Sequence, residues 1–283
     1  MRWTCCLCTV GQVVHTLPEG EPVVGVTSLG DAIFVLRWKT KDQVELYDIV
    51  TYKLLSRMTV PNAHGFADMT SCEYYQCAYI ADHKIMCVHR LDVKGPVTRV
   101  SQWPVEDKPR SLVVNAAHSV LVTCDVVRKI KEFSSHGKLI RQISLCCEVI
   151  NPMHAIELTT GQFVVCHGNH GDSVNRVCLL DTDGRSIIHS HGGQPGSDTD
   201  QYHGPVRLAV DYYSFVFVAD INNRRVTVLS PTLNYVRQLV ASNQLKGDPL
   251  RLCVDIHRHR LYVADNEWKD DRHTAGRVVV FSV

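Results

Sequence analysis

A repeated segment of sequence constrains this chain more than any other feature. Near the C-terminus the segment reads Pro249-Leu-Arg-Leu-Cys-Val-Asp255, followed by Leu261-Tyr-Val-Ala-Asp265. Almost the same residues occur earlier, as Pro205-Val-Arg-Leu-Ala-Val-Asp211 and Val216-Phe-Val-Ala-Asp220. Self-similarity at a period of roughly 40 to 50 residues indicates a repeat architecture, because one such unit cannot bury its apolar face alone.

Six such units can be aligned along the chain. Each contains short runs of β-branched and aromatic residues separated by Gly, Pro, Asn and Asp, which is the pattern of strands and turns. The predicted units are 22–60, 65–103, 109–145, 152–191, 205–240 and 249–283. We expect one all-β domain over 1–283: a six-bladed β-propeller with four antiparallel strands per blade around a central channel.

The last unit contains only three predicted strands before the chain ends at Val283. A fourth strand is available at the other end of the chain, as Gly11-Gln-Val-Val-His-Thr-Leu17. We therefore assign residues 1–17 to blade six as its closing strand. Ring closure of this kind removes the two open sheet edges that would otherwise invite aggregation.

Composition limits the partners of such a ring. The formal net charge is +1, from 30 basic and 29 acidic residues, so nucleic acid could be attracted only by a local patch. No apolar run is long enough to suggest a membrane span, and no membrane partner is expected. Residues 1–10 lack the features of a signal peptide. Cysteines such as Cys87 and Cys166 lie in apolar strand segments, which favours a reducing, cytoplasmic location.

Three motifs resemble those of NHL-repeat propellers: Pro-x-Arg-Leu-x-Val-Asp, Tyr/Phe-Val-Ala-Asp and Asn-Arg-Arg-Val, the last at residues 223–226. The first unit departs most, because Arg37 stands where the repeat usually has Asp. Similar propellers form the C-terminal module of tripartite-motif ubiquitin ligases, so the resemblance implies recognition of protein or RNA. The spacing of Cys5, Cys6 and Cys8 is not that of a zinc-binding RING or B-box, and ligase activity cannot be inferred from this chain.

Residues that recur once per blade are expected to be architectural. The second strands end in an Asp series, which we expect to accept hydrogen bonds from turn N–H groups, and the third strands carry basic residues that can pair with it. These series are Asp82, Asp125, Asp220 and Asp265, and Lys84, Lys129, Arg176, Arg225 and Arg277. Function is expected where the period breaks. Such breaks occur at Arg37 and His167, which replace the Asp, and in an inserted loop, 191–202, that is either a functional lip or a tolerated insertion.

The position two residues after the start of each unit predicts an anion site. Aligned by unit, it reads Val24, Ala67, Ser111, His154, Arg207 and Arg251. First strands line a propeller's channel, so His154, Arg207 and Arg251 would converge at one mouth, facing an apolar arc. Guanidinium groups suit a carboxylate or a phosphate. The alternative is that each Arg is neutralised by a nearby acid such as Glu157, Asp211 or Asp255.

RNA binding and catalysis are the alternative functions. Arg207, Arg251 and Arg224 interleaved with Tyr202 and Trp268 could hold phosphates and stack bases. The peptidylglycine-amidating lyases are similar in fold and hold zinc through channel histidines, but only His154 occupies a matching position here. We find no catalytic motif and expect neither a metal nor a cofactor. The sequence therefore favours a non-catalytic interaction module, expected to be a monomer, that binds a protein or peptide partner across one face and the channel mouth.

Overall fold

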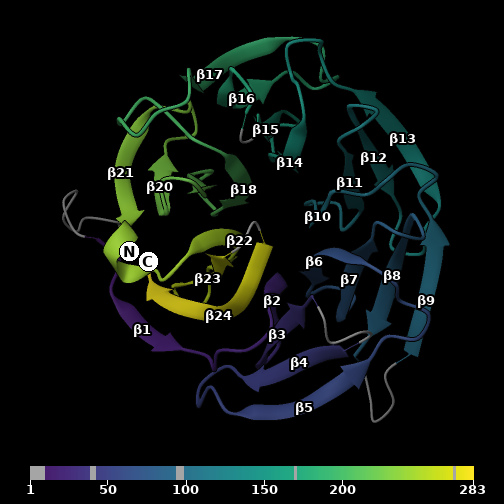
Figure 1. Ribbon diagram of the computed structural model, residues 1–283. Helices are drawn as coiled ribbons and strands as arrows, with labels where there is room; N and C mark the ends of the chain where they lie inside the picture. Colours follow the sequence, from purple (N-terminus) through teal and green to yellow (C-terminus); the bar gives the residue numbers. More distant parts are fainter. Residues whose placement is uncertain (1–9, 39–42, 94–98, 169–170, 270–271) are drawn as a thin grey trace.

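The computed structural model describes residues 10–38, 43–93, 99–168, 171–269 and 272–283. Its strands form six four-stranded antiparallel sheets arranged in a ring around a central channel (Figure 1). The predicted six-bladed, all-β propeller is therefore confirmed. In the described part of the chain the only helical segment is a 3-10 turn, Ser242–Gln244, and no helix there is long and apolar enough to cross a membrane.

The strands of each blade follow one another from the channel outward. Blades one to three are β2 (Val23–Leu29), β3 (Ala32–Arg37), β4 (Gln43–Asp48), β5 (Leu54–Thr59); β6 (Phe66–Cys72), β7 (Cys77–Asp82), β8 (Cys87–Asp92), β9 (Arg99–Pro104); and β10 (Ser111–Val114), β11 (Val120–Cys124), β12 (Lys129–Phe133), β13 (Leu139–Ser144). Blades four and five are β14 (Pro152–Glu157), β15 (Phe163–His167), β16 (Asn175–Leu180), β17 (Ile187–Gly193); and β18 (Pro205–Val210), β19 (Val216–Asp220), β20 (Arg225–Leu229), β21 (Tyr235–Val240).

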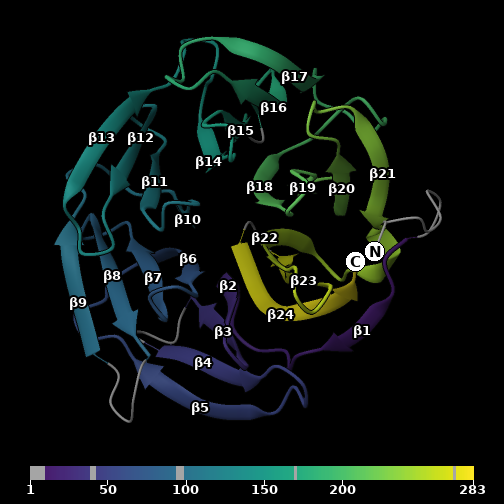
Figure 2. The same ribbon diagram turned by 180° about the vertical axis from the view of Figure 1, so that it is seen from behind.

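Blade six combines both ends of the chain. It contains β22 (Asp248–Asp255), β23 (Arg260–Lys269), β24 (Arg272–Ser282) and, outermost, β1 (Val13–Thr16). Val13 pairs with Phe281 and Thr16 with Val279, so the first and last strands of the chain, β1 and β24, lie side by side in both views (Figures 1 and 2). The predicted closure is confirmed by β1, which is shorter than the segment 11–17 expected from the sequence, and residues 1–9 of the assigned closing segment lie outside the described residues.

The core lies between neighbouring blades. Phe34 and Leu36 of β3, for example, pack against Met69 of β6 and Ile80 of β7. Second strands such as β7, β11, β15 and β19 are buried along their whole length, because each has a blade on both sides. This explains why their sequences are continuously apolar and do not alternate, a pattern usual for strands covered on both faces.

The recurring Asp residues join parts of the blades that contain them. The Asp82 carboxylate accepts hydrogen bonds from the N–H groups of Lys84 and Ile85 in the turn after its strand, as expected. It also accepts from His64 and Gly65, in the loop that leads into the blade's first strand. Two of the predicted ion pairs are present, Arg225–Asp220 at 2.9 Å and Arg277–Asp265 at 2.8 Å. These periodic residues are structural in this ring.

Candidate functional site

Each of the inner strands of blades four, five and six begins with a β-bulge. In blade five Pro205 pairs with Asp220 and Arg207 with Ala219, so Val206 is left unpaired. His154 and Arg251 occupy the equivalent position opposite Cys166 and Ala264. A bulge redirects the side chain next to it. These three residues therefore lie at the channel, as the sequence predicted.

The same register corrects the expected composition of the opposite arc. In blades one and two the residues after the bulge are Gly25 and Asp68, not Val24 and Ala67. In blade three Ser111 pairs with Thr123, which matches the pair Leu208–Val218 of blade five. Arg110, one residue earlier, therefore takes the position equivalent to Arg207. Gly25 leaves no room for a side chain, since a Cβ there would lie 2.7 Å from the Cβ of Met69. The arc is thus not apolar: it contains an acid and a third arginine.

Asp68 is the acid that neutralises the buried arginines. Its carboxylate lies 2.8 Å from Nη1 of Arg207 and 3.4 Å from Nε of Arg251, and it accepts a hydrogen bond from the N–H of Leu112. Neutralisation was predicted as the alternative to an anion site, but the acids named for it were wrong. Those acids have other roles: Glu157 pairs with Arg141, Asp211 accepts N–H groups of its own turn, and Asp255 pairs with Arg258.

Arg251 also ties several blades together. Its guanidinium donates to the carbonyl oxygens of Val24 and Ala67, from blades one and two, and to that of Leu250 in its own strand. Burial lowers the pKa of Arg251 well below its ordinary value, and the charge of Arg207 acts in the same direction. Because an arginine stays protonated in a protein, two like charges are held together at the channel axis.

A cavity of about 820 Å³ opens above these arginines. It lies on the face of the ring where the inner strands begin, which we call the arginine face. The cavity is lined by Arg110, Arg207, Arg251, Arg224, Lys246, Asp248 and Trp268, among others. Arg224 is exposed, and Trp268 is 55% exposed, so the rim combines a cation with an accessible aromatic ring.

Acidic groups balance part of the charge at this rim. Lys246 lies 2.6 Å from Glu19 and 3.8 Å from Glu267. Asp248 lies inside the cavity, and burial raises the pKa of its carboxyl group to about 6. The positive charge is therefore concentrated at the axis of the ring and does not extend over the whole face.

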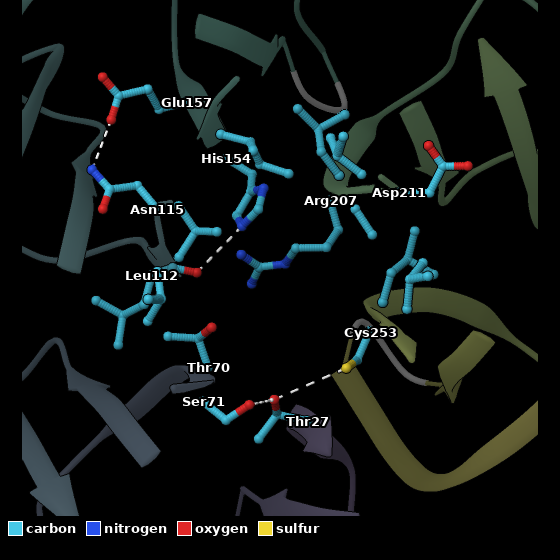
Figure 3. Close-up of a pocket in the computed structure, with 18 of the residues that line it drawn as sticks. Thr27, Thr70, Ser71, Leu112, Asn115, His154, Glu157, Arg207, Asp211 and Cys253 are labelled. Carbon is cyan, nitrogen blue, oxygen red and sulfur yellow. Dashed lines mark hydrogen bonds between the residues drawn. The ribbon is translucent and has the colours of Figure 1, made fainter. Parts of the chain in front are cut away.

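A second cavity, of about 470 Å³, opens at the opposite end of the channel (Figure 3). Its walls are mostly apolar, with a hydroxyl pair at Thr27 and Ser71, whose oxygens are 2.7 Å apart. His154 lies here with Nε2 3.4 Å from the carbonyl oxygen of Leu112. Burial lowers the pKa of His154 well below its ordinary value, so the imidazole is neutral and its Nε2 donates that bond.

The remaining predicted binding residues lie away from the cavities. Arg37 is buried, pairs with Glu45 at 2.7 Å and binds three backbone carbonyls. His167 is fully buried with Nε2 3.4 Å from Sγ of Cys178, and burial lowers the pKa of this histidine to about 4. Tyr202 is only 1% exposed and bonds to Thr227, so it cannot stack on a base. These three side chains belong to the interior of the fold.

The inserted loop is held against blade five. Arg225 donates hydrogen bonds to the carbonyl oxygens of Ser197, Asp198 and Gln201. The His191 ring also contacts this loop, with its Nε2 3.0 Å from the carbonyl oxygen of Thr199. The segment is thus an ordered extension of the blade. Among the described residues, no group of three or more His, Cys, Asp or Glu side chains is arranged to hold a metal ion.

Sequence reasoning missed Asp68 and Arg110 because it counted residues from the start of each unit. In blades one and two the first pair of the inner strand lies one residue after the counted start, at Val23 and Phe66, and in blade three β10 pairs without a bulge, so the count is off by one position in either direction. An arginine directly after Pro109 was the available signal for Arg110. Nothing in the sequence distinguishes Asp68 from an ordinary turn acid.

Comparison with known proteins supports the fold. No family model matches the chain, and neither does any curated protein. Among solved structures, the PQQ-bound aldose sugar dehydrogenase of Streptomyces coelicolor is similar with a TM-score of 0.66, 10% identity, and coverage of 95% of this chain and 98% of the other. The Cps50 (Swd1) β-propeller domain of Myceliophteria thermophila is similar with a TM-score of 0.60 and 12% identity, over 96% of this chain and 99% of the other. Virginiamycin B lyase of Staphylococcus aureus is similar with a TM-score of 0.59 and 9% identity, over 94% of this chain and 98% of the other.

Together with the six sheets of the ring, these likenesses define the class of the protein, a six-bladed β-propeller, and nothing finer. The similar structures include enzymes by name as well as a propeller domain without a named reaction. A fold shared by such different proteins does not decide the function. The function must be argued from the residues of the channel.

Proposed function

We propose that this chain is a non-catalytic, NHL-like propeller that binds a protein or peptide partner across its arginine face. The observation that carries the proposal is the basic cavity at the channel mouth, with Arg110 and Arg224 accessible beside exposed Trp268. Tryptophan and arginine around a concave centre are the residue types that dominate protein interfaces. The NHL-like assignment rests on the motifs and on the Asp–Arg pairs they form in blades five and six.

Protein recognition fits these residues better than RNA recognition. Tyr202, a candidate for base stacking, is buried, and Tyr213 lies in the β18–β19 turn, at the opposite end of the blade from the arginine face. Binding of a single strand needs a positive groove with successive aromatic platforms. Here the charge is confined to the axis and is flanked by Glu19 and Glu267. RNA remains the second outcome of the test below.

Compartment and oligomeric state belong to the same proposal. Every cysteine among the described residues is a free thiol, which supports a reducing compartment such as the cytoplasm. The closing strand β1 covers the edge of β24 in blade six, which supports a monomer.

The test compares captures by three forms of the protein from one lysate, with and without RNase. The forms are the parent, a double variant Arg224→Glu/Trp268→Ala, and the control Arg185→Glu in the β16–β17 turn on the opposite face. We expect a protein that the parent and the control retain, that the double variant loses, and that RNase does not release. Retention that depends on RNA supports the RNA function instead. Equal retention by all three forms shows that another surface is used.

A further inference from the structure

The positive charge at the channel axis is not fully balanced by the protein. Three guanidinium groups, those of Arg110, Arg207 and Arg251, lie close enough to act on one another. The carboxylates paired with them are Asp68, at the axis, and Asp125, whose Oδ2 lies 4.0 Å from Nε of Arg110. Buried charges in proteins are normally paired, so an excess cation at this position needs an explanation.

The excess charge borders the cavity of the arginine face, which Arg110 and Arg251 line, and Arg207 lines both this cavity and the opposite one. Arg207 is 3% exposed, and the only hydrogen-bond partner found for its guanidinium among the described residues is Asp68, while its Nε has none. Asp68 lines the opposite cavity but not this one. The arginines therefore separate Asp68 from the cavity. Their positive charge faces a space with no carboxylate at its floor.

We propose that this cavity binds a single carboxylate group, held between Arg207 at its floor and Arg110 at its wall. The inference rests on the proposed function for the source of that carboxylate, which is an acidic side chain or the C-terminus of the partner. A guanidinium presents parallel N–H donors that match the two oxygens of a carboxylate. The bound group would complete the charge balance that Asp68 begins.

A carboxylate fits the charges better than a phosphate dianion does. The excess at the axis is one positive charge, which one carboxylate neutralises. At the rim, Lys246 is already paired with Glu19 and Glu267. Asp248 lines the cavity, and the positive charge of Arg224 acts on its carboxyl group. A second negative charge would therefore lie near the carboxylates of Glu19, Glu267 and Asp248.

Small carboxylates provide a direct test on the whole chain. The probes are N-acetylglycine, which represents a peptide C-terminus, and N-acetyl-glutamate methylamide, which represents an acidic side chain. Inorganic phosphate and N-acetylglycinamide are the controls, all at the same ionic strength. The readouts are the melting temperature and the Nε–Hε NMR signals of the arginines. We expect a carboxylate probe to raise the melting temperature by a few degrees and to shift the Arg207 signal, because a ligand of the native state stabilises it.

Two variants separate binding from stability. Arg110→Gln, on a half-exposed side chain, is expected to weaken carboxylate binding by about tenfold, since a charge-assisted contact is lost. Asp68→Asn has the opposite sign: it increases the unbalanced charge, so carboxylate binding is expected to become several-fold tighter although the free protein melts earlier. A purely structural role for Asp68 predicts earlier melting with no gain in binding.

The outcomes distinguish this inference from the proposed function. If neither carboxylate shifts the Arg207 signal, or if phosphate does so more strongly, the carboxylate site is wrong even where the partner capture succeeds. If a carboxylate binds while the capture shows no dependence on the arginine face, the site is right and the protein-recognition proposal fails. A response to only one of the two carboxylates identifies which source the cavity accepts.

Discussion

At the scale of single residues, burial decides which candidates can act. His154, Arg207 and Tyr202 have similar chemical promise in the sequence, yet each is almost fully buried, at 4%, 3% and 1% exposure. Only Arg207 lines the basic cavity of the arginine face, while His154 lines the opposite one and Tyr202 lies in the core between blades four and five. Candidate chemistry therefore has to be filtered through the tertiary structure.

Asp248 provides a residue-scale prediction. Burial raises the pKa of its carboxyl group from 3.8 to about 6, with Arg224 opposing and Asp265 adding to the effect. A raised carboxyl pKa means that ionisation costs stability, so the cost is absent below about pH 4 and grows as pH rises through 6. Asp248→Asn should then stabilise the ring by about 1 kcal/mol at pH 7.5, allowing for screening at this partly exposed site.

Urea unfolding of both forms at pH 7.5 and pH 4 measures this difference. The gain should largely disappear at pH 4, where the aspartate is protonated in the folded chain and about half protonated in the unfolded chain. A variant that is equally or less stable at pH 7.5 would show that Asp248 is stabilised by its neighbours and not strained by burial.

At the scale of elements, Arg37, which breaks the repeat, connects two separate parts of the chain. Arg37 ends β3 where most blades have an Asp, and its guanidinium donates to carbonyl oxygens of Pro18, Glu21 and Gly276. These carbonyls belong to the segment between β1 and β2 and to β24. Arg37 thus fastens the N-terminal segment to the last blade, which explains why blade one departs from the consensus.

Replacing Arg37 by Met should destabilise the ring by about 3 kcal/mol, because the buried Glu45 carboxylate loses its closest cation. Arg57→Met is the matched control, since Arg57 contacts the same carboxylate at 3.3 Å but its side chain is 53% exposed and should cost less than about 1 kcal/mol. Urea denaturation compares the two. Adding Glu45→Gln should recover part of the loss in the Arg37 variant alone, and equal losses for both arginines would contradict this role.

At the scale of the whole molecule, ring closure joins the ends of the chain. Strand β24 runs from Arg272 to Ser282, and β1 covers the C-terminal part of its edge through pairs such as Val13–Phe281. Deleting residues 1–16 should expose this edge, and an exposed strand edge promotes association. We expect oligomers or aggregates in light scattering and a lower melting temperature.

Deletion of residues 1–9, which keeps β1, is the control for that experiment and should leave a monomer. If the chain lacking residues 1–16 also stays monomeric with the parent melting temperature, closure by β1 contributes little to this ring. The comparison isolates the strand from the rest of the N-terminus.

The sequence by itself determined the repeat, the number of blades, the closing strand and the periodic Asp and Arg pairs. These follow from local patterns of apolar residues and turns, which are written directly in the order of the amino acids. Only the tertiary structure decided the composition of the channel. The pairing of β6 starts at Phe66, one residue after the start counted from the sequence, which brings Asp68 to the axis, and the absence of a bulge among the pairs of β10 does the same for Arg110. A shift of one position reverses which side chains face the channel, and no pattern within a single unit encodes that shift.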